Sequence, residues 1–231
     1  MFAETLLTWW NKIVIEDPRW RPDPGWVVQG GMDHGKTNPT TIERAYIDFE
    51  GTIYFAGEYY QPGREVWQHA PTKKNMPDFT RMQPCYADPT IFHSTSQQAQ
   101  RPGLASESAK SIAELYEEQG IEVFAPFGGD RSDVSFAARL MLHWADLENR
   151  EPTVKIVCRN YSEAPQFGSH PWDSPNLLWE LMRARRHKLT AQQLLSRNTS
   201  EAIVDKGNHA RDARKYLLMS HPEPAQKTFE R

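Results

Sequence analysis

Three aspartates and one histidine are the residues whose types and positions indicate chemistry. Asp33 lies just past the first apolar segment, residues 26–30, and Asp88 lies just past the fourth. Asp212 lies in a C-terminal segment with helical periodicity, on the same face as His209. Carboxylates at strand ends and on a covering helix can converge on one point. Their oxygen atoms suit Mg²⁺ or Mn²⁺, and two such ions can support hydrolysis of a phosphodiester bond.

Taken one at a time, these residues have ordinary explanations. Asp88 precedes a proline and could simply begin a turn, and Asp212 could be a solvated helix residue. His209 could do no more than hydrogen-bond to Asp212. Only the set, placed in one fold, predicts a site.

A competing motif overlaps the first aspartate. Residues 30–37, GGMDHGKT, match the phosphate-binding P-loop pattern GxxxxGK[ST] and follow a predicted strand. A P-loop must lead into a helix whose N-terminus holds the phosphates. Here Asn38-Pro39 follow at once, and the next aspartate, Asp48, lies on the adjacent predicted strand. The sequence therefore favours the carboxylate site, and a nucleotide-binding protein that uses Lys36 and Thr37 remains the alternative.

The order of the expected elements indicates an α/β fold. Strands are expected at residues 26–30, 41–49, 52–60, 82–87, 121–127 and 154–158, and helices at 2–15, 106–119, 133–149, 176–187, 190–195 and 208–219. A hairpin followed by alternating helices and strands predicts a mixed β-sheet, antiparallel hairpin plus parallel strands, flanked by helices. We expect an N-terminal helix and Pro-rich linker over residues 1–25, a main domain over 26–219 and a flexible tail over 220–231.

Composition excludes several classes of protein. The chain has 231 residues and a formal net charge of -3, so one domain is expected, and a generic nucleic-acid-coating protein, which is usually basic, is disfavoured. A nuclease is not excluded, because bound cations neutralise its carboxylates. Cys85 and Cys158 lie outside any CxxC pattern and are expected to be buried free thiols. No segment has the length of a membrane span or the pattern of a signal peptide.

Five segments, in order, carry a resemblance to a known family. They are GMDHGKTNPTT, IDFEGTIYFAGEYY, YADPTIF, NLLWELMRARR and VDKGNHARDARKYL. Together they resemble the C-terminal nuclease domain of the large terminase subunit of tailed bacteriophages, from Trp26 to Leu218. The resemblance implies a ribonuclease-H-like fold. It also implies an endonuclease that uses clustered carboxylates with Mg²⁺ or Mn²⁺, two ions being expected, to cut concatemeric double-stranded DNA during genome packaging.

The same resemblance implies roles for individual residues. Asp33 matches the first-strand acid, Asp88 the fourth-strand acid, and His209 and Asp212 the two residues of a helical H-x-x-D pattern. Asp33 is expected to bridge two cations, with Asp88 on one of them and Asp212 on the other. His209 is expected to ligate a metal, orient water or contact the scissile phosphate. The resemblance also makes Asp205, close to the site but before Gly207, a weaker candidate metal ligand.

The expected partners also follow from the resemblance. They are double-stranded DNA, an ATPase motor domain, the portal and the small terminase subunit, with no membrane, in the cytoplasm of an infected bacterial host. The family's full-length proteins carry an N-terminal ATPase motor, and the residues before Trp26 cannot form one. The chain is therefore expected to be an isolated nuclease domain, with residues 2–25 as a residual linker or a native leader.

Basic residues that could bind the DNA backbone occur in patches. The candidates are Lys36 in the loop after Asp33, then Lys73, Lys74 and Arg81, and finally Arg183, Arg185 and Arg186. Such residues would give a salt-dependent attraction without sequence preference. The last group closes a predicted helix, where a favourable interaction with the helix dipole explains it equally well. A ribonuclease-H-like module that binds DNA or a partner without cutting is the third hypothesis.

Overall fold

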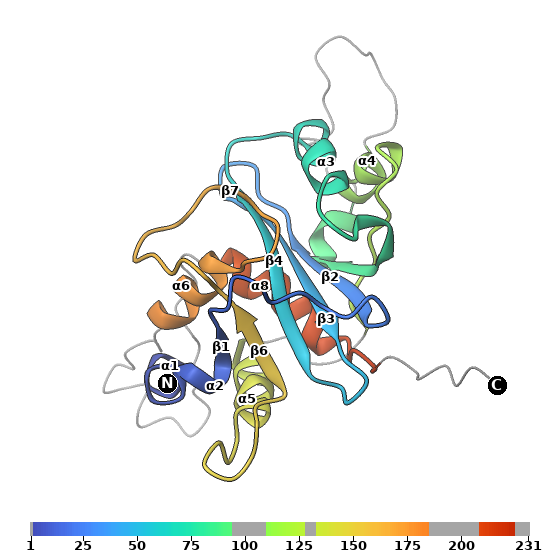
Figure 1. The fold of residues 1–231 in the computed structure, drawn as a ribbon. Coiled ribbons are helices and arrows are strands. Elements are labelled where there is room, and N and C mark those ends of the chain that lie inside the picture. The colour runs from blue at the N-terminus through green and yellow to red at the C-terminus, as the bar shows by residue number, and fades with distance from the viewer. Residues whose placement is uncertain (1, 94–109, 128–132, 185–207, 225–231) are drawn as a thin grey trace, which may run out of the picture.

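The computed structural model describes residues 2–93, 110–127, 133–184 and 208–224 (Figure 1). Its helices are α1 (Phe2–Thr8), α2 (Trp10–Ile13), α3 (Val66–Lys74), α4 (Ile112–Glu118), α5 (Asp133–His143), α6 (Pro175–Arg183) and α8 (His209–Met219), with the 3-10 turns η1 (Phe79–Arg81) and η2 (Pro89–Phe92). Its strands are β1 (Val14–Ile15), β2 (Val27–Asp33), β3 (Thr40–Ile47), β4 (Ile53–Gln61), β5 (Met82–Ala87), β6 (Val154–Val157) and β7 (Gly168–His170).

The strands form one mixed sheet. Its order is β1-β6-β4-β3-β2-β5, and β7 pairs with β4 outside this path. In the centre of the sheet, β3 pairs antiparallel with both β2 and β4. On the two sides the pairing is parallel: β5 pairs with β2, and β6 pairs with β4 and β1. The predicted combination of an antiparallel hairpin with parallel strands is confirmed.

Helices cover both faces of the sheet. One apolar core joins α1, α5, α6 and α8 to the sheet, and a second lies under α3 and α4 on the opposite side. In Figure 1 α3 and α4 stand together, away from α5, α6 and α8. Along β3 the side chains alternate between the two cores, because Ala45 and Ile47 belong to the first and Ile42 and Tyr46 to the second. Both thiols, Cys85 and Cys158, are free and buried, as predicted.

The turn between β3 and β4 is built by Asp48. Its carboxylate Oδ1 accepts hydrogen bonds from the backbone N–H groups of Glu50 at 3.0 Å and Thr52 at 2.7 Å. Gly51 has a φ of 85°, a left-handed conformation that glycine adopts without a steric penalty. The predicted hairpin at Glu50-Gly51 is therefore confirmed.

Helix α8 lies directly against the middle of the sheet, and Gly31 permits this approach. A Cβ atom at position 31 would lie 1.9 Å from the backbone oxygen of Ala213 on α8. In the same strand, a Cβ at Gly30 would lie 2.9 Å from Cys85 Sγ. Gly30 and Gly31, the first two glycines of the GGMDHGKT segment, thus serve strand packing and helix packing.

The N-terminal segment is part of this packing. Phe2, Leu6 and Ile13 are each 0% exposed and belong to the core that includes α5, α6 and α8. β1 then adds two residues to the edge of the sheet beside β6. The segment expected as one helix over residues 2–15 is therefore two short helices followed by a strand.

Three further expectations differ from the structure. The segment 121–127 makes only one bridge, in which Phe124 pairs with Tyr86, since it runs beside β5 without a continuous ladder. β7 was not expected, and the helix expected at 133–149 ends at His143. The short helix expected at 190–195 lies outside the described residues.

Candidate active site

Asp33 and Asp88 lie side by side where two parallel strands end. Asp33 is the last residue of β2, and Asp88 directly follows β5. In the register of these strands Met32 is opposite Ala87, and the N–H of Asp88 donates to the carbonyl oxygen of Met32 at 3.2 Å. Pairing of the two strands therefore fixes the two carboxylates as neighbours, as the sequence predicts for acids at strand ends.

Helix α8 brings His209 to this edge of the sheet. His209 Nδ1 lies 2.9 Å from Asp33 Oδ2, and both side chains are largely buried. His209 therefore pairs with the strand aspartate. Asp212, on the next turn of the helix, interacts with other groups.

Asp212 and Asp88 are held by residues that the sequence analysis did not identify. Lys215 Nζ donates to Asp212 Oδ1 at 2.8 Å, and Asn208 Nδ2 donates to Asp212 Oδ2 at 2.6 Å. The hydroxyl of Tyr216 donates to Asp88 Oδ2 at 2.9 Å. Lys215 and Tyr216 follow Asp212 by three and four residues, the spacing that puts helix side chains on one face. That spacing is the signal that could have found them.

The electrostatics link all three carboxylates. Burial raises the pKa of Asp33, and Asp88 raises it further, whereas the hydrogen bond to His209 and the charge of Lys215 oppose the change. Burial, followed by the carboxylates of Asp88, Asp212 and Asp33, raises the pKa of Tyr216, which stays a protonated donor. All three acids therefore act on the pKa of one tyrosine hydroxyl.

The pKa of His209 is raised for a related reason. Burial alone lowers it, but the hydrogen bond to Asp33 and the charges of Asp33, Glu180 and Asp212 outweigh that effect. The ammonium of Lys215 pairs with Asp212 and partly offsets the charge of the acids, and the carboxylates favour the protonated form of His209. Carboxylate oxygens are therefore gathered at this edge of the sheet, together with groups that offset their charge.

The donor chemistry suits a hard divalent cation, since Asp33 and Asp88 present neighbouring carboxylates. Within the described ranges, no set of three or more His, Cys, Asp or Glu side chains is close enough to form a complete metal site. Asp212 is engaged with Lys215 and Asn208 instead. Asp205 lies outside the described residues.

The P-loop alternative fails on geometry. Gly30 and Gly31 lie inside β2 and pair with Arg44 and Glu43 of the antiparallel strand β3. The segment after Asp33 leads into that strand, and no helix begins there to receive a phosphate.

Two residues of the P-loop pattern are occupied in other ways. His34 Nδ1 lies 3.0 Å from the hydroxyl of Tyr116, and burial lowers the pKa of His34 to about 4, so the imidazole is neutral. Lys36 Nζ pairs with Glu65 at 2.7 Å.

The predicted DNA-contacting residues are scattered. Lys36 is exposed near Asp33, and Lys74 is exposed at the end of α3. Lys73 is only 1% exposed and donates to Cys85 Sγ at 3.3 Å, so it is not among the surface cations, because α3 packs it against β5.

The remaining basic candidates lie at element ends. Arg81 ends η1, directly before β5 and roughly 20 Å along that strand from Asp88, and donates to the carbonyl oxygens of Pro24 and Trp26. Arg183 ends α6 and stacks on Trp179. Arg185 and Arg186 lie outside the described residues.

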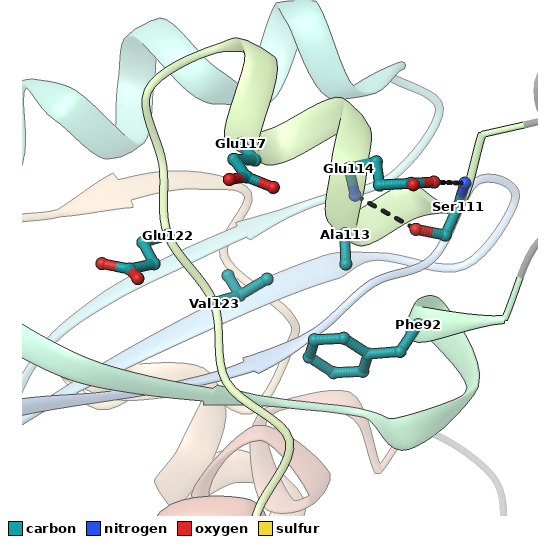
Figure 2. Close-up of a pocket in the computed structure, with 7 residues that line it drawn as sticks. All are labelled: Phe92, Ser111, Ala113, Glu114, Glu117, Glu122 and Val123. Carbon is teal, nitrogen blue, oxygen red and sulfur yellow. Dashed lines mark hydrogen bonds between the residues drawn. The ribbon is translucent and has the colours of Figure 1, made fainter.

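A separate pocket lies beside η2 and α4 (Figure 2). Its volume is about 470 Å³, and it is lined by Phe92, Ser111, Ala113, Glu114, Glu117, Glu122 and Val123. Ser111 and Glu114 cap α4 reciprocally, as the dashed lines in Figure 2 show. Because none of the predicted site residues lines this acidic pocket, it is distinct from the carboxylate site.

Comparison with solved structures identifies the fold. The large terminase of a thermophilic bacteriophage, in complex with ADP, superposes with a TM-score of 0.59 at 13% identity, covering 91% of this chain and 42% of that chain. The P22 large terminase nuclease domain gives 0.56 at 13% identity, with 90% and 87% covered. The large terminase nuclease of the thermophilic phage G20c, with bound cobalt, gives 0.54 at 15% identity, with 96% and 97% covered.

The likeness is one of structure. No family model matches the sequence, and no curated protein sequence does. The chain spans 42% of the ADP-bound large terminase but most of the isolated P22 and G20c nuclease domains. It therefore has the ribonuclease-H-like fold of the nuclease domains of phage large terminases.

Proposed function

We propose that this protein is a divalent-metal-dependent endonuclease that cuts double-stranded concatemeric DNA during viral genome packaging. One observation carries the proposal. Asp33 and Asp88 meet at the ends of parallel strands, and α8 brings His209 to Asp33 and carries Asp212 on its next turn, in a fold shared with large terminase nucleases. Hydrolysis of a phosphodiester bond needs cations and proton acceptors at one place, and the carboxylates at this edge of the sheet can hold the first and supply the second.

Asp33, Asp88 and Asp212 are the proposed ligands of Mg²⁺ or Mn²⁺, with two ions bound, and Asp205 is an additional candidate. When bound, such ions lower the pKa of water and stabilise the leaving oxygen. The G20c nuclease was crystallised with bound cobalt, which supports the use of a divalent cation by a protein of this fold.

The chain's own residues prepare the acids for that task. The hydroxyl of Tyr216 donates to Asp88 Oδ2, and the backbone N–H of Thr90 donates to Asp88 Oδ1 at 2.7 Å. Both oxygens are therefore held, and the carboxylate has a fixed orientation. Lys215 and Asn208 fix both oxygens of Asp212 in the same way. His209, at the start of α8, fixes Asp33 through Nδ1, which donates to Oδ2 in the tautomer that carries its proton there.

The partners belong to the same proposal. The exposed Lys36 and Lys74, together with Arg81, Arg183, Arg185 and Arg186, are the candidate contacts to the DNA backbone. One similar large terminase was crystallised with ADP, which supports an ATPase motor as the partner of this domain. The portal and the small terminase subunit would complete the assembly in the cytoplasm of the infected host. In the described part of the chain, no helix is long and apolar enough to cross a membrane.

Cleavage of supercoiled plasmid tests the proposal. With Mn²⁺, the protein should convert the plasmid to nicked and linear forms, and a chelator should stop the reaction. DNA binding without cleavage in Mg²⁺ and in Mn²⁺ would indicate a non-cleaving module instead. ATP should leave the melting temperature unchanged, because the GGMDHGKT segment is a strand and a loop; stabilisation by ATP would contradict that interpretation.

A further inference from the structure

Glu180 of α6 is a buried acid that contacts the first turn of α8. Its side chain is 1% exposed. Oε2 accepts a hydrogen bond from the backbone N–H of Arg211 at 2.8 Å, and the N–H of Ala210 also donates to this carboxylate. Oε1 accepts from the hydroxyl of Tyr60, on β4, at 3.1 Å. Glu180 therefore joins α6, the sheet and α8 at one point.

These contacts replace an ordinary helix cap. The first N–H groups of a helix have no partner within the helix, and an Asn at the N-cap usually accepts from one of them. α8 begins at His209 with Asn208 as its N-cap, yet the Asn208 side chain makes no capping hydrogen bond. It donates to Asp212 Oδ2 instead. Glu180, which lies on α6, therefore caps the start of α8 in place of Asn208. The Asn208 side chain orients Asp212, an acid of the candidate site.

We propose that Glu180 is a positioning residue for the candidate active site, because it fixes the turn of α8 that carries His209. This role rests on the proposed nuclease function, and in it Glu180 acts through α8 without contacting DNA or metal. Tyr60 supports the same arrangement, since its hydroxyl holds Glu180 and its ring centroid lies 6.5 Å from that of His209. Loss of the acceptor would release the start of α8 and with it the hydrogen bond from His209 to Asp33.

Two substitutions separate positioning from charge. Glu180→Leu removes the acceptor and keeps a side chain of similar size. Glu180→Gln keeps an amide oxygen for the N–H groups and an amide donor for Tyr60. We expect Glu180→Leu to lower kcat for plasmid cleavage by about 10- to 100-fold, as is typical when a supporting hydrogen bond is lost, with KM for DNA changed less than about twofold. Glu180→Gln should restore most of kcat.

Glu163→Gln is the matched control, because Glu163 is exposed in the loop between β6 and β7 and its replacement should leave kcat unchanged. Circular dichroism at the assay temperature must show each variant to be folded. If Glu180→Leu is unfolded, Tyr60→Phe is tested in its place. Tyr60→Phe removes only the hydroxyl that donates to Glu180 Oε1, and it should also lower kcat. Full kcat in the folded Leu and Phe variants would overturn the proposal.

A second measurement does not depend on cleavage. In the metal-free protein, the imidazole proton of His209 in its hydrogen bond with Asp33 should give a resolved downfield NMR signal. That signal should disappear or shift in Glu180→Leu and return in Glu180→Gln. An unchanged His209 signal in Glu180→Leu would overturn the positioning role, whether or not the wild type cuts DNA. Absence of cleavage by the wild type would contradict the nuclease proposal but not the positioning of His209 by Glu180.

Discussion

Individual residues show how a concentration of acids is stabilised in the folded chain. Each acid has a hydrogen-bonding partner. Asp33 pairs with His209, Asp88 pairs with Tyr216, and Asp212 pairs with both Lys215 and Asn208. Unpaired buried carboxylates are costly, so each partner stabilises the folded chain. The same partners hold the acids in defined orientations, which is what a metal site requires of its supporting residues.

Lys215 should compete with a cation for Asp212. Its ammonium lies 2.8 Å from Oδ1 and lowers the negative potential around Asp33 as well. Replacing it with Met should therefore tighten Mn²⁺ binding about threefold to tenfold, seen as a larger rise in melting temperature on adding Mn²⁺.

Lys74→Met is the control for that comparison, because Lys74 is exposed at the end of α3. Its response to Mn²⁺ should match that of the wild type. An equal or smaller Mn²⁺ response in Lys215→Met than in the wild type would count against a cation site at Asp212.

The sequence could predict the acids but not their partners. Asp33 and Asp88 were recognisable because strand ends are visible in the apolar pattern. Lys215 and Tyr216 looked like ordinary residues of a helix, and only their spacing from Asp212 pointed to the site. Lys73 looked like a surface cation, although α3 buries it against Cys85. Burial of a long charged side chain depends on tertiary packing, which local composition does not encode.

Among the elements, α8 is the one whose placement matters most. It carries His209 and Asp212 on the face toward the strand ends, and Arg214 on a face buried against Glu43 and Phe55. Gly31 lets it approach the sheet closely. The helix and strand β2 therefore position the site together.

Gly31→Ala should disrupt that approach. The new Cβ would meet a backbone oxygen of α8 at 1.9 Å, and neither backbone can move without displacing other contacts. We expect a loss of about 3 kcal/mol or more in the free energy of unfolding, measured by urea denaturation.

Gly30→Ala in the same strand is the control, because its Cβ would meet the side chain of Cys85 and not a backbone. It should cost about 1 kcal/mol. Equal losses in the two variants would show that close packing of α8 is not the reason for glycine at position 31.

Glu180 should also make stability depend on pH. Burial raises its pKa from 4.5 to about 8. Because the folded-state value is the higher one, the stabilisation is fully present below the unfolded pKa and is lost as pH rises through about 8. Glu180→Gln does not titrate, so its stability relative to the wild type should grow from about pH 5.5 to about pH 8.5.

The comparison is a difference between two proteins that both keep Glu43, Glu58 and His209, so it reports the titration of Glu180 together with the electrostatic coupling of Glu180 to Glu58 and His209. Urea unfolding at the two pH values measures it. Parallel pH profiles for the two proteins would contradict the raised pKa of Glu180.

At the scale of the whole molecule, the N-terminal segment belongs to the packed structure. The sequence suggested a helix and linker ahead of the domain, because the Pro-rich stretch interrupts every periodic pattern. In the structure α1 and α2 contribute to the core, and β1 pairs with β6. A two-residue strand paired with a partner far along the chain leaves no local signal, so sequence patterns alone could not find it.

Leu6 and Leu7 test this directly, since they are neighbours with opposite environments. Leu6 is 0% exposed and Leu7 is 67% exposed. Leu6→Ala should cost about 2 to 5 kcal/mol in the free energy of unfolding, and Leu7→Ala less than about 0.5 kcal/mol. Chemical denaturation of both variants measures the difference. Equal, small losses would mean that α1 is a dispensable extension.

The central claim concerns Asp33, which lies between Asp88 and His209. The most direct measurement is plasmid cleavage in Mn²⁺ by Asp33→Asn, with Asp146→Asn as a control at an exposed turn where Asn is well tolerated. Asp33→Asn should remain folded and lose at least about a thousandfold in cleavage rate, while Asp146→Asn cuts like the wild type. Cleavage by folded Asp33→Asn at the wild-type rate would contradict the assignment of this site.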